Sequence, residues 1–321
     1  MTHTGWVIGA RGLLGRATTE ALRRDDAWET IAPEPLPWSD DEALRRRATE
    51  SVTLLLDRAS ASGGSWAVFW TAGTVVTSSP AEAMAEELRQ FRLVLDVLAE
   101  TLAARPDRGT GCLFFASSAG GVYGGSVDPP FTEFTDPVPI SPYGRFKLDA
   151  EALVEEFSRR AGVATVSGRI SNLYGPGQRL EKMQGLISHI ARAQLSPAPA
   201  SIYVTLDTLR DYVYVDDCAA LIVDVTAAAL AASASEGPLQ VTKNLISGQS
   251  VTISSVLGYF RTIAKGHPHV MLGSSPASAL QAVDLRLASV VWPELDRRDH
   301  MPLPAGIHAT LSDVLAGIQR G

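Results

Sequence analysis

Short apolar runs alternate with longer segments of helical periodicity through the first half of the chain. The runs occupy residues 5–8, 29–32, 66–70, 112–116 and 163–169. Runs of this length, flanked by turn-forming residues, predict β-strands. Strands separated by helices predict a parallel sheet that is covered on both faces, and therefore an α/β fold.

Helical periodicity and capping signals predict helices over about 13–22, 40–50, 81–104 and 142–161. Ser39 or Asp40 can cap the second helix, and Ser141-Pro142 combines a capping hydroxyl with proline at the first helical position. Gly162 is a typical end for the fourth helix. The alanine- and serine-rich stretch 227–237 predicts a helix end followed by a loop.

Glycine is frequent in the turn after the first run. Gly9, Gly12 and Gly15 allow the backbone to turn tightly and to approach a pyrophosphate at a helix N-terminus. The place of this turn between a strand and a helix predicts a dinucleotide site. Other residues of the turn and of neighbouring strand ends are expected to line it: Arg11, Leu13, Leu14, Thr71, Ala72, Gly73 and Ala116.

The end of the second strand bears on the choice of nicotinamide cofactor. An NAD site usually has an acid there, and Glu34 is the candidate in Ala32-Pro33-Glu34-Pro35. Arg11 could instead pair with the 2′-phosphate of NADP through its planar guanidinium. The sequence favours NADP over NAD.

Tyr143 and Lys147 lie one helical turn apart, about 25 residues after Ser117 and Ser118. At i and i+4 the two side chains share a helix face, and an ammonium near a phenol favours the phenolate. Lys147 can also bond the nicotinamide ribose, while a serine at the strand end can hold a substrate oxygen. These four residues predict proton transfer at an alcohol or ketone.

These motifs resemble the extended short-chain dehydrogenases/reductases, in the nucleotide-sugar epimerase/dehydratase group. The resemblance covers about residues 5 to 260, through the segments 9–15, 115–124, 141–147, 169–178, 209–217 and 245–252. It implies a Rossmann-type doubly wound parallel sheet with a smaller C-terminal α/β substrate domain. The expected division is a dinucleotide-binding domain over 1–177, whose sheet also receives parts of 208–245, and a substrate domain from 178–207 and 246–321.

The resemblance also implies roles for individual residues. Tyr143 would be the acid and base, and Lys147 its partner and ribose ligand. Tyr123 and Asn172 would contact a nucleotide sugar, and Arg210 would pair with its diphosphate. Many members dimerise through the helices after residues 81 and 142, so a homodimer is expected.

Three departures from the family pattern narrow the reaction. Ala119 stands where the family usually has a hydroxyl residue, so Ser118 is expected to replace it. Ala119-Gly120-Gly121 replaces the Thr-Asp-Glu triplet of 4,6-dehydratases, which argues against dehydration. No arginine occurs in 273–278, where a second diphosphate ligand is usual.

The sequence therefore predicts hydride transfer at a secondary alcohol or ketone carbon, expected at C4, of a nucleotide-linked sugar. A 4-ketoreductase using NADP is favoured over a 4-epimerase that keeps NAD. The missing late arginine leaves open a reductase of a small carbonyl compound without a nucleotide. The intact Tyr143/Lys147 pair argues against a non-enzymatic dinucleotide sensor.

Bulk composition restricts partners and location. The net charge is −7, with lysine and arginine dispersed, so neither nucleic acid nor an anionic membrane is an expected partner. Cys112 and Cys218 are expected to be reduced core thiols of a cytoplasmic protein, and no apolar run near 18 residues is evident. His267 and His269 lack the further ligands of a metal site, so no metal is expected.

Overall fold

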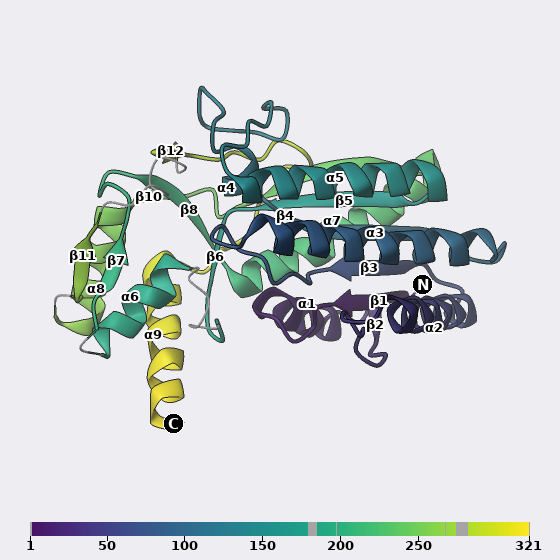
Figure 1. The fold of residues 1–321 in the computed structure, drawn as a ribbon, viewed down its shortest axis with the longest axis horizontal. Coiled ribbons are helices and arrows are strands. Elements are labelled where there is room, and N and C mark those ends of the chain that lie inside the picture. The colour runs from purple at the N-terminus through teal and green to yellow at the C-terminus, as the bar shows by residue number, and fades with distance from the viewer. Residues whose placement is uncertain (1, 179–184, 197, 267, 274–281, 321) are drawn as a thin grey trace.

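A six-stranded parallel sheet forms the centre of the computed structural model, which describes residues 2–178, 185–196, 198–266, 268–273 and 282–320. The strand order is β2-β1-β3-β4-β5-β9, and its first five strands can be followed in Figure 1. The strands are β1 (His3–Ile8), β2 (Trp28–Ile31), β3 (Trp66–Trp70), β4 (Gly111–Ser118), β5 (Ala164–Ile170) and β9 (Gln240–Leu245). All five strands expected from the apolar runs are present, with ends shifted by up to two residues.

Helices cover both faces of this sheet, which confirms the predicted doubly wound arrangement. One face packs against α2 (Asp41–Ser62), α3 (Ala81–Ala103) and α5 (Pro142–Ala161). The other packs against α1 (Leu13–Arg24) and α7 (Val215–Glu236).

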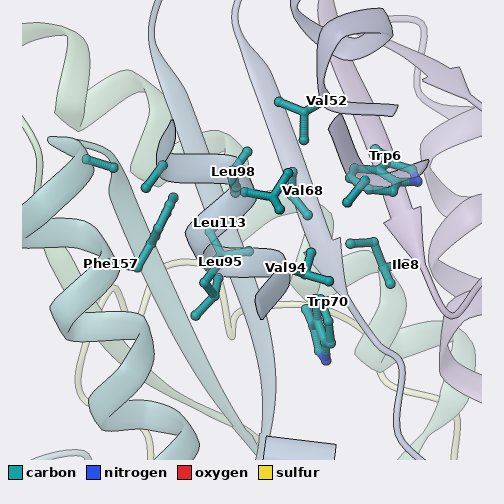
Figure 2. Close-up of a cluster of buried hydrophobic side chains, with 14 of the residues drawn as sticks. Trp6, Ile8, Val52, Val68, Trp70, Val94, Leu95, Leu98, Leu113 and Phe157 are labelled. Carbon is teal, nitrogen blue, oxygen red and sulfur yellow. The ribbon is translucent and has the colours of Figure 1, made fainter. Parts of the chain in front are cut away.

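Alternating strand residues divide between two cores. Trp6, Val68 and Leu113 point towards α2, α3 and α5, and Figure 2 shows them in one cluster with Leu98 and Phe157. The residues next to them along each strand enter the opposite core. Successive side chains of a strand point to opposite faces, so a sheet covered on both sides needs apolar residues at every position. This requirement explains the continuous apolar runs.

Local signals set the start of α2 and both ends of α5. Asp40 caps α2 by accepting from the Ala43 amide at 3.0 Å, and Ser141 caps α5 by accepting from the Gly144 amide at 3.0 Å. Gly162 ends α5 with φ of 62°. Each of these assignments agrees with the sequence expectation.

Two helices are longer than predicted. α2 continues past residue 50 to Ser62, because Val52, Leu55, Leu56 and Ala59 extend its buried stripe. The stretch 227–237 is not mainly a loop: α7 remains helical to Glu236, and the chain turns at Gly237.

A smaller unit lies to the left of the main sheet in Figure 1. Its strands form the order β10-β8-β12, with β6 also paired to β8, and a separate pair β11-β7. An apolar cluster joins this unit's helices and strands. The elements are β6 (Asn172–Tyr174), α6 (Leu186–Gln194), β7 (Ala200–Ile202), β8 (Leu209–Tyr214), β10 (Ser250–Thr252), α8 (Ile253–Ala264), β11 (Val270–Leu272), β12 (Asp284–Leu285) and α9 (Leu303–Arg320).

The chain passes between the two units more than once. Within 208–245, β9 joins the main sheet but β8 belongs to the smaller one. In the opposite direction, Trp292 and Leu295 pack on the core under α7, and Asp296 accepts from the buried Lys243 ammonium at 2.6 Å. A segment near the C-terminus, which contains Trp292, Leu295 and Asp296, therefore returns to the dinucleotide half of the molecule.

The helix α7 is long and apolar enough to cross a membrane by length and composition. The sequence expectation had found no such segment. Half of its apolar window is buried, and it packs against α1 and the back of β4 and β5. These contacts are those of a core helix. Cys218 on α7 and Cys112 on β4 are both buried and unpaired.

Candidate active site

The glycine turn lies at the carboxyl ends of neighbouring parallel strands. Gly9 has φ of 95°, and a Cβ there would lie 2.6 Å from the Ala72 amide nitrogen. A Cβ on Gly15 would lie 2.1 Å from the Gly9 carbonyl oxygen. Thr71 fixes the adjoining loop by donating its hydroxyl to the Ile8 carbonyl at 2.9 Å. Only glycine at positions 9 and 15 permits this close approach of β1, β3 and α1.

The start of α1 fits a dinucleotide pyrophosphate. Gly12 is its N-cap and supplies no side-chain hydrogen bond, and its first turn contains no acidic residue. The first amides and the positive end of the helix dipole are therefore free for an anion. Arg11 and Glu34, the two residues expected to select the cofactor, are both exposed and form no ion pair within the described ranges.

Tyr143 and Lys147 lie in the first turns of α5, beside the end of β4. The Lys147 ammonium donates to the Ala116 carbonyl at 3.0 Å and lies 5.8 Å from the centre of the Tyr143 ring. It is also 5.1 Å from the centre of the Phe115 ring. The predicted pair is therefore adjacent, and the lysine is anchored near the carboxyl end of β4, on the same edge of the sheet as the glycine turn.

A short helix, α4 (Ala119–Val122), packs directly against the tyrosine. A Cβ on Gly121 would lie 3.3 Å from the Tyr143 ring, and a Cβ on Gly144 would lie 2.1 Å from the Gly121 carbonyl oxygen. These two glycines allow α4 and α5 to touch. The backbone of α4 consequently forms one wall beside the Tyr143 ring.

The two serines at the end of β4 have different surroundings. Ser118 caps α4, its hydroxyl accepting from the Gly121 amide at 3.3 Å, and it is partly exposed. Ser117 is buried and donates its hydroxyl to Glu151 at 2.5 Å. The structure thus argues against a catalytic role for Ser117, because strand alternation turns it into the interior. A substrate-binding role for Ser118 stays a prediction.

Tyr123 was expected to contact substrate, but its side chain is fully buried. Its hydroxyl donates to the Thr132 carbonyl at 2.9 Å and accepts from Arg169 at 2.8 Å. Burial raises the pKa of Tyr123, although the neighbouring Arg169 cation opposes that effect. We therefore correct its assignment from substrate ligand to core residue.

Asn172 and Arg210 lie on the paired strands β6 and β8. The Asn172 side chain is exposed and donates its amide to the Asp211 carbonyl at 2.8 Å. Arg210 is only 7% exposed, donates to the Leu209 carbonyl at 2.8 Å, and has no ion pair with any described residue. Burial lowers the pKa of Arg210, although the Tyr212 hydroxyl and the Asp284 carboxylate oppose that effect. A buried cation with no carboxylate in ion-pair contact is a candidate anion ligand.

The carboxylate of the next residue, Asp211, holds together the backbone segments around Asn172 and Arg210. Its carboxylate accepts from the Ser171 hydroxyl at 2.6 Å, the Ser247 amide at 2.9 Å and the Gln249 amide at 3.1 Å. Burial raises the pKa of Asp211, and the hydrogen bonds from Ser171 and Ser247 counteract the rise. The carboxylate thereby joins β8 to the loops that follow β5 and β9.

A family model described as "NAD dependent epimerase/dehydratase family" matches residues 6–236 of this chain. The chain belongs to the NAD-dependent epimerase/dehydratase family. The matched range contains the glycine turn, α4, Tyr143, Lys147 and Arg210.

Curated members with different activities are similar to parts of the chain. An Escherichia coli dTDP-4-dehydro-6-deoxyglucose reductase is 32% identical over 149 residues, which cover 46% of this chain and 44% of the relative. A putative UDP-glucose 4-epimerase of Methanocaldococcus jannaschii is 35% identical over 107 residues, covering 33% of this chain and 35% of the relative. The chain thus spans less than half the length of these relatives.

Solved structures agree with the fold over nearly the whole chain. The UDP-glucose 4-epimerase of Thermotoga maritima with UDP-glucose aligns with a TM-score of 0.75 at 22% identity, covering 98% of this chain and 99% of that one. RMD from Pseudomonas aeruginosa complexed with NADPH aligns with a TM-score of 0.77 at 21% identity, covering 99% of each. These similarities confirm the expected fold.

Sequence reasoning missed several residues that the structure brings to the site. Glu151 was detectable, since it continues the spacing of four from Tyr143 and Lys147, and Arg169 opens one of the family-like segments. Gly121 and Gly144 gave no sequence signal of their contact. Residues 274–278, within the segment without the late arginine, and His267 of the histidine pair lie outside the described residues.

Proposed function

We propose that this protein is an NAD(P)-dependent oxidoreductase acting at a secondary alcohol or ketone carbon, C4, of a nucleotide-linked sugar, and that it works as a 4-ketoreductase. One observation carries the proposal. Lys147 is anchored to Ala116 at the end of β4 and lies 5.8 Å from the centre of the Tyr143 ring, on the edge of the sheet that also bears the glycine turn.

The chain's own residues would handle the proton. A bound nicotinamide would supply the hydride to the carbonyl carbon. Tyr143 would donate its phenolic proton to the carbonyl oxygen, and the Lys147 ammonium would stabilise the phenolate left behind. Ser118 would hold the same oxygen if its hydroxyl turned from the Gly121 amide, a bond of 3.3 Å that is long for a strong interaction.

The wall beside Tyr143 supports reduction rather than dehydration. The α4 segment Ala119-Gly120-Gly121 presents no carboxylate or hydroxyl side chain. Elimination of water needs a positioned acid and base, which these residues do not provide. The similarity to a dTDP-4-dehydro-6-deoxyglucose reductase supports the same choice.

Arg210 supports a substrate with a diphosphate. Its guanidinium is buried and forms no ion pair with a described residue; Asp284 acts on it only from a longer distance, so a bound anion would stabilise the buried charge further. We propose the diphosphate of a nucleotide sugar as that anion, with the exposed Asn172 side chain nearby on β6 as a further ligand. Exposed Arg11 supports NADP as the cofactor.

The second candidate is a 4-epimerase that retains NAD. The similarity to a putative UDP-glucose 4-epimerase supports it, and so does the exposed Glu34 just beyond β2. Such an enzyme would remove hydride from a sugar and return it to the other face. Stoichiometric NAD in the purified protein, identified by mass spectrometry, would favour this candidate over the ketoreductase.

Thermal-shift measurements with UDP, GDP, dTDP and CDP test the substrate class. We expect at least one nucleotide to stabilise the protein, and its effect to disappear in Arg210→Gln. Stabilisation by NADPH in both proteins serves as the control for folding. If NADPH stabilises the parent protein but none of the four nucleotides does, the nucleotide-sugar proposal is wrong and a small carbonyl substrate is supported.

We also propose a homodimer in the cytoplasm, with the outer faces of α3 and α5 as the contact. None of the large hydrophobic side chains exposed in the described ranges belongs to either helix. Ion pairs occur there instead, including Arg92–Glu156 at 3.5 Å and Arg160–Asp96 at 2.7 Å. A dimer through this face would therefore be held mainly by polar contacts.

A further inference from the structure

A third ionisable side chain shares the helix face of Tyr143 and Lys147. Glu151 follows Lys147 by one turn, and the three residues occupy positions i, i+4 and i+8 of α5. A lysine and a glutamate four residues apart normally attract each other. Here they have separate partners on β4, because Lys147 donates to the Ala116 carbonyl and Glu151 accepts from the Ser117 hydroxyl.

Arg169 on β5 holds the Glu151 carboxylate. Its guanidinium donates from Nη2 to Oε2 at 2.7 Å and from Nε to Oε1 at 3.1 Å. Both side chains are 7% exposed. Ser117 is directly opposite Arg169 in the β4–β5 register, so the sheet itself sets this geometry.

The Arg169 guanidinium keeps its charge inside the protein. Burial by itself lowers the pKa of Arg169, but the Glu151 carboxylate outweighs that effect and raises it. The remaining Nη1 donates to the Tyr123 hydroxyl at 2.8 Å, which fixes the guanidinium from the other side. The Glu151 carboxylate therefore faces a guanidinium that is fixed on two sides.

Loss of that cation would change the environment of the acid–base pair. An unneutralised carboxylate on Glu151 would lie one turn from the Lys147 ammonium and about 12 Å along the helix from Tyr143, at 1.5 Å per residue. It would attract the ammonium and oppose formation of a phenolate on the same helix face. Neither residue would need to contact substrate for this effect.

We propose that Arg169 is a positioning residue for proton transfer, because it holds the Glu151 carboxylate and so reserves Lys147 for Tyr143. The inference rests on the proposed role of Tyr143 and Lys147 as the acid–base pair. If the ion pair had only a structural role, it would hold α5 against the sheet and would not affect the ionisation of the Tyr143 phenol.

Ionisation of the Tyr143 phenol can be followed without substrate or cofactor. The chain has seven tyrosines, so ¹³Cζ-tyrosine labelling gives a simple NMR spectrum, and the Tyr143 signal is the one missing from Tyr143→Phe. Its titration would be recorded in the full-length parent protein, Arg169→Gln, Glu151→Gln and the double variant. Lys147→Met is the control, and it is expected to move the titration to higher pH.

We predict that Arg169→Gln and Glu151→Gln shift the titration midpoint of Tyr143 in opposite directions. Arg169→Gln raises the titration midpoint by about 0.5–1 pH unit, the size expected for one charge at about 12 Å and an effective dielectric constant of 20–40. Glu151→Gln lowers it, and the double variant returns close to the parent because no net charge has changed. A structural clamp would give unmoved midpoints, or shifts of the same sign.

Each outcome decides one claim. If Lys147→Met shifts the Tyr143 midpoint and Arg169→Gln does not, the role of Arg169 is wrong while the acid–base pair stands. If Lys147→Met leaves the midpoint unchanged, the acid–base pair itself is wrong. Should Arg169→Gln fail to fold, Glu151→Gln decides alone, and an unchanged or raised midpoint overturns the inference.

Discussion

At the residue scale, the type of a residue in the sequence predicted its chemistry better than it predicted the direction of its side chain. The spacing of Tyr143 and Lys147 was enough to place both on one face of α5, because a helix has a fixed period. Ser117 and Ser118 could not be separated in the same way. Their roles depend on which face of β4 each side chain occupies, and only the strand's partners determine that.

The choice between NADP and NAD also depends on single residues. Arg11 is exposed in the glycine turn, and no described carboxylate pairs with it. If its guanidinium binds the 2′-phosphate, Arg11→Ala should weaken NADPH binding about tenfold or more, equivalent to about 1.4 kcal/mol or above, and leave NADH binding nearly unchanged. Isothermal titration calorimetry with both cofactors measures this difference.

Glu34→Ala is the matched control for that experiment. If the cofactor is NADP, removal of the Glu34 carboxylate should change the affinity for NADPH and the affinity for NADH only slightly. A parent protein that binds NADH more tightly than NADPH, with Glu34→Ala removing that preference, would contradict the assignment and favour the epimerase candidate.

At the scale of elements, strands and caps were predictable and close contacts were not. Asp40, Ser141 and Gly162 act locally, so their sequence signals were sufficient for one end of α2 and both ends of α5. The C-terminal end of α2 depends on how far along the helix its apolar side chains can pack against the core. The contact of α4 with α5 depends on two glycines 23 positions apart, Gly121 and Gly144.

That contact gives a prediction for the site wall. In Gly144→Ala the new Cβ would lie 2.1 Å from the Gly121 carbonyl oxygen, so α4 must move away from α5. We expect a loss of about 1–3 kcal/mol in the free energy of unfolding, although alanine favours a helix over glycine. Chemical denaturation measures the loss, and activity should fall further because the wall beside Tyr143 shifts.

The control for this variant is Gly317→Ala, at a helical glycine of α9 where no atom lies within 4 Å of a built Cβ. It should be neutral or slightly stabilising. If Gly144→Ala proves as stable and as active as Gly317→Ala, the close packing of α4 on Tyr143 is not needed.

At the scale of the whole molecule, the sequence predicted the doubly wound sheet because strand and helix periods repeat locally. It did not predict that 286–298 returns to the dinucleotide half. That return depends on long-range pairing, such as buried Lys243 with Asp296 at 2.6 Å. A buried lysine in β9 requires a partner, but its sequence position does not identify which acid supplies it.

The proposed dimer is also a property of the whole molecule. Because the exposed surface of α3 and α5 is polar, we expect a dimer that is weak and that dissociates as ionic strength rises. Light scattering at low and at 1 M salt checks this expectation. A dimer that persists unchanged at high salt would show that assembly uses another surface.

The central claim is that Tyr143 transfers the proton during hydride transfer at a sugar carbonyl. The most direct measurement compares NADPH oxidation by the parent protein and Tyr143→Phe, with dTDP-4-dehydro-6-deoxyglucose as the probe and cofactor binding measured in both. We predict turnover by the parent, and a fall of at least about 100-fold in kcat for the variant with NADPH affinity retained. Equal rates in the two proteins would contradict the account.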